Sequence, residues 1–318
     1  MSLIDEELLE IVACPSCRSR LVATAGRLYC SSAKCSRKYD VVEGIPILLP
    51  AKLAKEQQLA IDVWSKEYRT LLNEGSFDFI DQYALSDFTL ISDHLGLDDK
   101  PILLEMGCGR ARLSSLAAES GCKTFGLDIS LDGLLLAKRF FAMKGVHGHF
   151  INGDMCSIPI RSNSVDIIFG GGVIEHATDT QRIVNGMLDV LRPGGICVNT
   201  VPIVSLSTLT QGLLTGTIPE LPILKNIYRF IHNDVFKEKY LYYGYEKSFT
   251  IGQLKRIFTR AGAFRVVVDM YYVEWTLKFF HNRLIRMFIQ RLLRYRPFWP
   301  MVSVTAIKRN QGNNLHSD

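Results

Sequence analysis

Four cysteines near the start of the chain have the types and spacing of a metal-binding cluster. Cys14 and Cys17 form a Cys-Pro-Ser-Cys pair, and Cys30 and Cys35 follow with four residues between them. Two such pairs suit a zinc ribbon, in which four thiolates close a tetrahedral site. A disulfide pairing and four unrelated core cysteines are the alternatives. About fifty residues build only a small core, so we expect the metal to be structural.

A second group of residues has the order of a nucleotide-binding site. Residues 101–111 read as an apolar strand that runs into Gly107-Cys108-Gly109, and a helix is expected over 113–119. Such a turn brings the backbone close to a ligand at a helix N-terminus. Asp128 ends the next expected strand, twenty-one residues after Gly107. An acid at this spacing accepts hydrogen bonds from ribose hydroxyls.

The next two expected strands also end in residues suited to a nucleoside. Asp154, followed by Met155, ends the first strand and suits an adenine amino group, and residues 164–172 form a buried strand that ends in glycines from Gly170 onward. The third glycine of the dinucleotide fingerprint is replaced by Ala111, and Glu105 precedes the first glycine. Both departures favour S-adenosylmethionine over NAD, because a nearby carboxylate can balance its ammonium group.

One histidine follows the strand over 164–172. His176 stands at the expected pocket edge, and it is the first candidate for a general base or for a ligand to a divalent ion that polarises the acceptor. The alternative is a histidine that only shapes the cofactor loop.

The segments around these residues resemble two known families. The Cys pairs, Tyr39, the Glu43-Gly44 turn and the Ile-Pro-Ile-Leu-Leu run at 45–49 resemble the Trm112-like zinc-binding domain over about residues 8–50. Members of that family bind methyltransferases or are fused to them. The five elements over 101–202 are similar to class I S-adenosylmethionine-dependent methyltransferases, in particular the type 11 group that contains quinone, sugar and polyketide methylases.

The second resemblance implies an α/β, Rossmann-like, seven-stranded methyltransferase fold behind a small N-terminal zinc ribbon. Strands over 264–272 and 301–308 and a helix over 250–263 complete it. We expect a ribbon over 1–50, a methyltransferase domain over 51–310 and a disordered tail over 311–318. Helices over 51–73 and 77–97 bridge the two, with Tyr68 or Tyr83 bordering the cofactor pocket. The resemblance places cofactor binding at Glu105, Gly107, Gly109, Asp128, Asp154, Met155 and Gly170.

Charge is concentrated in one part of the chain. The 318 residues hold 37 Lys and Arg against 32 Asp and Glu, and residues 275–309 contain eight bases and no acid. A helix within 275–299 would place arginines on one side and leucine, isoleucine and phenylalanine on the other. Three arrangements compete: the apolar side packs on the domain, the helix lies on an anionic membrane, or the arginines bind RNA phosphates. The helical arginines are Arg283, Arg286, Arg291 and Arg294.

The sequence also bears on location. No run of about 18 apolar residues predicts a membrane-spanning helix, and the acidic start lacks the pattern of a signal peptide. We therefore expect a cytoplasmic protein with reduced thiols, and a membrane contact through 275–299 would be peripheral, at the inner face.

These features together predict an enzyme that methylates oxygen or carbon in a small or lipid-like metabolite and releases S-adenosylhomocysteine. Residues 203–247 are expected to form a lid over the acceptor. The loop at 169–172 lacks the Asn/Asp-Pro-Pro-aromatic motif of exocyclic-amine methylases, and the Pro-Cys or Thr-Cys of cytosine methylases is missing as well. The alternatives are a ribosomal RNA base methyltransferase with an N-terminal zinc site, and a non-catalytic partner of another methyltransferase.

Overall fold

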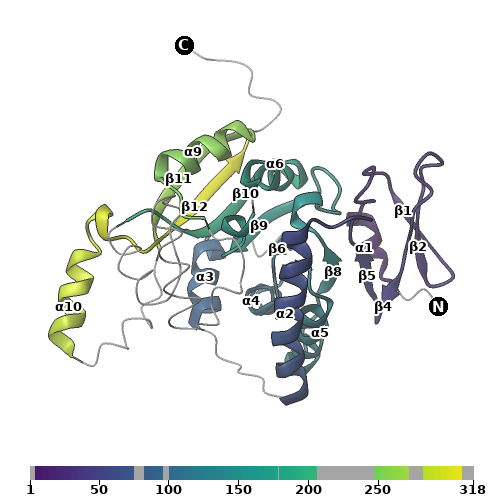
Figure 1. Ribbon diagram of the computed structural model, residues 1–318, viewed down its shortest axis with the longest axis horizontal. Coiled ribbons are helices and arrows are strands. Elements are labelled where there is room, and N and C mark those ends of the chain that lie inside the picture. Colours follow the sequence, from purple (N-terminus) through teal and green to yellow (C-terminus); the bar gives the residue numbers. More distant parts are fainter. Residues whose placement is uncertain are drawn as a thin grey trace, which may run out of the picture.

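The computed structural model describes residues 4–74, 82–95, 100–177, 179–205, 247–271 and 282–309. Its centre is a nine-stranded sheet in the order β11-β12-β10-β9-β6-β7-β8-β5-β4 (Figure 1). The strands of this sheet are β4 (Val41–Val42), β5 (Ile45–Leu48), β6 (Ile102–Met106), β7 (Lys123–Asp128), β8 (His149–Gly153), β9 (Val165–Gly171), β10 (Leu191–Pro202), β11 (Ala263–Tyr271) and β12 (Met301–Lys308).

Seven of these strands form the expected methyltransferase sheet. β6 to β10 pair in parallel, while β12 runs antiparallel between β10 and β11. The chain fills one half of the sheet with β6, β7 and β8 and then crosses over to β9 and β10. Ligands of open α/β sheets bind at the carboxyl ends of the strands beside such a crossover. The predicted α/β, Rossmann-like fold class is confirmed.

Helices cover both faces of the sheet. Figure 1 shows α6 and α9 on one side and α2 to α5 on the other. Local signals fix several ends: Thr250 and Gln253 form a capping box at the start of α9, and Gly145 ends α5 in the left-handed conformation. The helices are α2 (Lys55–Glu74), α3 (Gln82–Ser92), α4 (Arg112–Glu119), α5 (Leu131–Lys144), α6 (Thr180–Val190) and α9 (Ile251–Arg260).

The N-terminal segment adds two strands to the expected seven. Its own sheet has three strands, β1 (Leu21–Thr24), β2 (Arg27–Cys30) and β3 (Lys38–Tyr39). β4 and β5 leave that sheet and extend the large one, because β5 pairs in parallel with β8. Without β5, the backbone groups of β8 would form an open edge. Residues 41–48 of the expected ribbon are therefore part of the methyltransferase sheet.

The same segment also supplies a helix to the sheet. Between β8 and β9 the chain makes only a short 3-10 helix, η1 (Met155–Ser157). α1 (Glu6–Ile11) packs there instead, and its Leu8 and Ile11 belong to the same buried cluster as sheet residues such as Ile151. The Ala13 N–H donates to the Pro159 carbonyl at 2.9 Å, which ties the end of this segment to the β8–β9 connection.

Part of the predicted basic insertion is described. α10 (Arg283–Leu292) lies at the left end of Figure 1 and buries none of its residues, and Leu284 and Phe288 are 74% and 62% exposed. Its apolar side therefore does not pack on the domain as the first of the three arrangements requires. A 3-10 helix, η6 (Arg296–Phe298), joins it to β12. Residues 275–281, most of the predicted lid over 203–247 and the predicted tail over 311–318 lie outside the described residues.

None of the described helices is both long and apolar enough to cross a membrane.

Candidate cofactor pocket and zinc site

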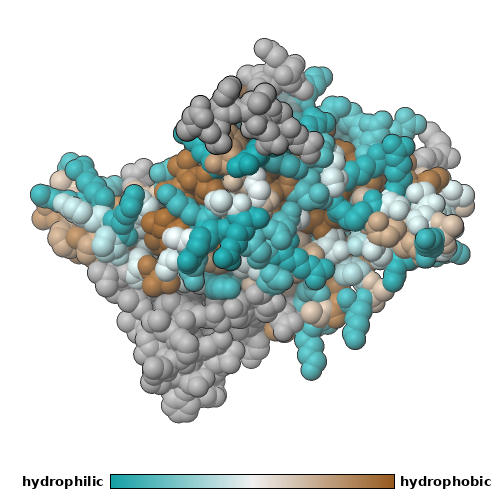
Figure 2. Space-filling view, turned by 90° about the horizontal axis from the view of Figure 1, so that it is seen from above, coloured by the Kyte–Doolittle hydropathy of each residue, from teal (hydrophilic) through white to brown (hydrophobic). Residues whose placement is uncertain are grey.

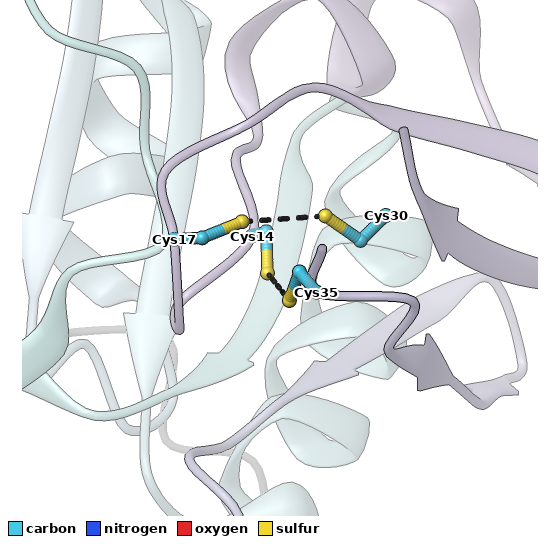
Figure 3. A group of neighbouring side chains, drawn as sticks. All are labelled: Cys14, Cys17, Cys30 and Cys35. Carbon is cyan, nitrogen blue, oxygen red and sulfur yellow. Dashed lines mark hydrogen bonds between the residues drawn. The ribbon is translucent and has the colours of Figure 1, made fainter. Parts of the chain in front are cut away.

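The four cysteines of the N-terminal segment come together (Figure 3). The Cys14 and Cys35 sulfurs lie 3.7 Å apart, and the Cys17 and Cys30 sulfurs lie 3.3 Å apart. All four ligand atoms are within 4.8 Å of one another. Four converging thiols, two on each knuckle, are the donor set of a structural zinc site. The residues present therefore fit the metal that the sequence predicts.

The surroundings tune these thiols differently. Hydrogen bonds from Ser19 lower the pKa of Cys17 to about 6, which favours its thiolate form. Burial raises the pKa of Cys30 to about 12, so zinc must displace its proton on binding. The Tyr39 hydroxyl lies 3.0 Å from the Cys14 sulfur and can donate a hydrogen bond to it as a thiolate. Hydrogen bonds of this kind orient the metal ligands and stabilise their negative charge.

A cavity of about 540 Å³ opens at the carboxyl ends of β7, β8 and β9. Its volume lies within the usual range for small-molecule sites. Five of the residues that the sequence singles out line it: Gly107, Asp128, Asp154, Met155 and His176. Glu105, Gly109 and Gly170 are not among the lining residues. Five of the predicted cofactor-binding and catalytic residues therefore surround one pocket, and the other three are not part of its lining.

The glycine turn after β6 is built for close approach. Gly107 and Gly109 adopt positive φ angles of 62° and 48°, and a Cβ on Gly107 would lie 2.8 Å from Val173. Only glycine takes this conformation at low cost. The Gly109 N–H donates to the Asp128 carboxylate at 2.8 Å, and the Ser130 N–H donates to its other oxygen at 2.7 Å. The turn and the acid after β7 thus hold each other in place.

The two acids behind this turn differ in their partners. The Glu105 carboxylate accepts from the Ser114 N–H at 2.8 Å and from its hydroxyl at 2.5 Å, which anchors α4 to β6. Burial raises the pKa of Glu105 to about 7, although these two hydrogen bonds lower it. Burial also raises the pKa of Asp128, while its backbone donors lower it. Asp128 alone of the two faces the cavity.

The third acid, Asp154, accepts a hydrogen bond from α2. Asp154 accepts from Cys156 N–H at 2.9 Å and from Gln57 Nε2 at 2.6 Å. Because each carboxylate oxygen has two lone pairs, these contacts leave acceptor sites for a ligand. Burial raises the pKa of Asp154.

α2 closes one side of the pocket, which the sequence indicates only in part. Tyr68 lines the cavity as one of the two expected tyrosines, and Tyr83 does not. The Tyr68 hydroxyl lies directly over Gly109, where a Cβ would collide with it. Trp64 stacks on Tyr68 with a ring-centre distance of 5.9 Å and also lines the pocket. Sequence reasoning missed Trp64 and Gln57 as site residues, although both lie on one side of α2 with Tyr68 at helical spacing.

On the β9 side of the pocket, His176 lines the cavity and Gly170 does not. His176 is half-buried at the end of the 3-10 helix η2 (Ile174–His176) and faces the cavity. Gly170 is inside β9, where a Cβ would lie 2.6 Å from the Asn199 side-chain oxygen, and its successors Gly171 and Gly172 line the pocket instead. Lys52 and Arg182 add positive charge to the lining and were also missed, because nothing in their local sequence marks them.

Comparison with known proteins agrees with this architecture. Residues 104–199 match the family model described as "Methyltransferase domain", and residues 5–44 match the model described as "Trm112p-like protein". The chain therefore carries a methyltransferase domain with a Trm112-like domain before it, as the sequence predicts.

Two curated proteins illustrate the sequence similarity. A ubiquinone biosynthesis O-methyltransferase of Cereibacter sphaeroides is 25% identical over 154 residues, which cover 47% of this chain and 62% of that protein. A malonyl-[acyl-carrier protein] O-methyltransferase of Enterobacter lignolyticus is 29% identical over 98 residues, covering 31% of this chain and 38% of that protein. The chain thus spans less than two thirds of the length of these relatives.

Solved structures share the fold at low sequence identity. The phosphoethanolamine N-methyltransferase 2 of Haemonchus contortus, in complex with S-adenosylhomocysteine, has a TM-score of 0.56 and 16% identity, over 83% of this chain and 62% of that one. The magnesium protoporphyrin IX methyltransferase of Synechocystis, with the same bound product, has a TM-score of 0.50 and 11% identity, over 80% of this chain and all of that one.

Proposed function

We propose that this chain is an S-adenosylmethionine-dependent methyltransferase that acts on oxygen or carbon of a small or lipid-like metabolite. The observation that carries the proposal is the pocket at the strand ends, where Gly107, Asp128, Asp154 and Met155 face one cavity. The methyltransferase-domain match over 104–199 supports the same reaction. The O-methyltransferase names of the relatives support an oxygen acceptor.

The pocket residues divide into cofactor and acceptor groups under this proposal. Asp128 would accept the ribose hydroxyls, and Asp154 with Met155 would hold the adenine. The role of Glu105 toward the ammonium group, and those of Gly109 and Gly170, stay predictions. S-adenosylmethionine would supply an electrophilic methyl group, which leaves sulfur as the acceptor attacks, with S-adenosylhomocysteine as product.

The remaining lining residues suit an acceptor with apolar or ring surface. Leu59, Ala60, Trp64 and Val173 contribute apolar area to the cavity. His176 would take the proton that a hydroxyl acceptor loses, since it is the imidazole that faces this space. Holding acceptor and methyl donor in line supplies much of the rate in such transfers.

Cofactor binding is tested by isothermal titration with S-adenosylhomocysteine. We expect Asp128→Ala to weaken binding at least about tenfold, because it removes the hydrogen-bond acceptor for the ribose. Asp269→Asn, on an exposed position of β11, is the control and should bind as the wild type does. Binding that is equal in all three proteins would overturn the cofactor site.

The acceptor class is tested by transfer of radiolabelled methyl groups into a fractionated cell extract. We expect label in the fraction of small molecules and lipids, and no label there with Asp128→Ala. Label confined to ribosomal RNA would instead favour the base methyltransferase. No transfer, despite intact cofactor binding, would favour the non-catalytic partner.

We also propose that α10 brings the enzyme to an anionic membrane surface, where a lipid-like acceptor would be found. Leu284, Ile285, Met287 and Phe288 are exposed on this helix, and the 275–309 stretch contains no acid. Figure 2 shows hydrophilic and hydrophobic residues side by side at the left end of the molecule, where Figure 1 places α10. Exposed apolar residues beside arginines are the pattern of interfacial helices.

Flotation with vesicles of phosphatidylglycerol and phosphatidylcholine tests this contact. The wild type should float, and the Leu284→Ser, Phe288→Ser double variant should not. Phe264→Ser, on β11, is the control for the loss of an exposed apolar side chain and should float. If the double variant floats as well as the wild type, or if ribosomal RNA binds this helix instead, the membrane contact is wrong.

A further inference from the structure

Three side chains outside the pocket and the cysteine cluster converge at the start of β8. Asp5, His147 and His149 each offer one ligand atom, and these atoms lie within 4.8 Å of one another. Asp5 caps the N-terminus of α1, and His149 is the first residue of β8. The cofactor pocket lies at the opposite, carboxyl end of β8, so the group belongs to a different part of the sheet. We call these three residues the edge cluster.

The geometry of the edge cluster is fixed mainly by His149. Its side chain is only 6% exposed, and its ring stacks on Phe125 with a ring-centre distance of 4.8 Å. His147 lies two residues earlier, and the two imidazoles meet edge to face at 4.9 Å. In extended chain, residues two apart point to the same side, which explains why both rings face α1.

The carboxylates on α1 complete the surroundings. Asp5 uses one oxygen to accept from the Glu7 N–H at 2.8 Å, which leaves the other oxygen for a cation. Glu7 lies 3.4 Å from His149 Nε2 through one oxygen and 2.8 Å from Lys123 Nζ through the other. Lys123 therefore offsets the charge of Glu7, and the second Asp5 oxygen can coordinate a cation.

Two imidazoles and a carboxylate are a donor set for divalent transition metals. Zn²⁺ binds such nitrogen and oxygen ligands in many proteins, and a water molecule or a second carboxylate can serve as the fourth ligand. Calcium and magnesium prefer all-oxygen sites and fit this set poorly. We propose that the edge cluster binds Zn²⁺, or a similar divalent transition-metal ion, and thereby clips α1 to β8. This site is additional to the four-cysteine site and independent of the methyltransferase proposal.

Zinc titration of the full-length, tag-free protein tests the edge cluster. The protein is first loaded with one equivalent of Zn²⁺, which fills the cysteine site, and is then titrated calorimetrically with ZnCl₂. We expect one further equivalent to bind. His147→Gln should weaken that second binding at least about tenfold, because it removes one of three ligands. His147 is exposed, so this variant should fold normally.

Two comparisons make the result specific. His94→Gln, an exposed histidine after α3, should bind the second equivalent as the wild type does. Asp5→Asn keeps an N-cap but loses the charged ligand, and it should weaken the second binding as well. The second equivalent should raise the melting temperature of the wild type and of His94→Gln, but not of His147→Gln. A single equivalent in the wild type, or equal second binding in His147→Gln, would overturn the proposal.

Discussion

The additions at the two ends of the nine-stranded sheet differ in how they are used. At the β8 end, α1 and β5 complete the face and the edge of the sheet, and Leu8, Val12 and Leu48 are fully or almost fully buried. At the β11 end, α10 buries none of its residues. Both segments have apolar residues at regular spacing, so the pattern alone does not tell packing from exposure. The difference lies in what the segments supply: α1 packs where the chain makes only a short 3-10 helix between β8 and β9, and β5 pairs with the edge of β8.

Polar contacts also attach the N-terminal segment to the sheet at the β8 end. Arg161 donates to the Leu9 carbonyl at 2.9 Å, and the Arg18 guanidinium pairs with Asp189 at 2.7 Å. Ser157 donates to the Pro15 carbonyl at 2.8 Å. These contacts join the knuckle and α1 to the β8–β9 connection and to the end of α6. The N-terminal segment is therefore part of the folded body, whereas α10 is a surface element.

The largest expected effect comes from the zinc site. Replacing Cys14 by Ser removes one of four thiolates from a cluster whose core is continuous with the sheet. We expect the free energy of unfolding of the whole chain to fall by about 4 kcal/mol or more, as for loss of a structural metal. Urea denaturation followed by tryptophan fluorescence measures it. All three tryptophans, Trp64, Trp275 and Trp299, lie outside the ribbon, so a local effect would leave this signal unchanged.

Cys122→Ser is the matched control for that variant. Cys122 is a buried cysteine of the α4 side of the sheet, distant in sequence from the cluster. We expect it to cost about 1 kcal/mol, the ordinary cost of a small core change. An equal loss in the two variants would mean that the cluster has no special role in stability.

A pair of identical substitutions compares the two ends directly. Leu8→Ala, in α1, should lower the free energy of unfolding by about 3 kcal/mol because it leaves a cavity in the core. Leu284→Ala, in α10, should change it by less than about 0.5 kcal/mol because that side chain is exposed. Equal effects would remove the distinction between the ends. The same urea denaturation measures both.

Glu105, the buried acid of β6, has a smaller and pH-dependent effect on the free energy of unfolding. The pKa of Glu105 is raised to about 7 from 4.5, so the folded chain keeps a proton that the unfolded chain loses as the pH rises through this window. Stability from this group is therefore full below about pH 4.5 and is lost as the pH approaches 7.

Glu105→Gln should remove that dependence. It keeps an acceptor for Ser114, and it should be more stable than the wild type at pH 8 by roughly 1–3 kcal/mol, but not at pH 4.5. Denaturation of both proteins at the two pH values checks this. A constant difference between the proteins would show that Glu105 does not titrate in this range.

The fold and the wall of the site were predictable to different extents. Strand ends carry their own signals, because Gly107, Asp128 and Asp154 follow apolar runs at characteristic spacing. The seven-stranded order could be inferred from them by resemblance. Trp64 and Gln57 could not, because sharing one side of a helix with Tyr68 does not show that this side docks over the pocket.

The same limit applies at the two ends. The cysteine spacing indicates a ribbon, yet the pairing of β5 with β8 joins Ile47 to Asn152, which are far apart in the sequence. The edge cluster was missed for this reason as well, since Asp5 meets His147 and His149 only when α1 packs on the sheet. The His-x-His spacing was the one local sign. For α10, the sequence predicts an amphipathic helix, but it does not show whether another part of the protein covers the apolar side.

We infer that the N-terminal segment and the pocket unfold as one cooperative unit, because Pro50, Lys52 and Gln57 follow β5 and line the cavity. The most direct test is denaturation of cobalt-substituted protein, in which thiolate-to-cobalt absorption reports the ribbon and tryptophan fluorescence reports the body. We predict that the two signals change at the same urea concentration, and that S-adenosylhomocysteine raises both midpoints equally. Loss of the cobalt signal at lower urea, or a ligand shift in fluorescence alone, would contradict the account.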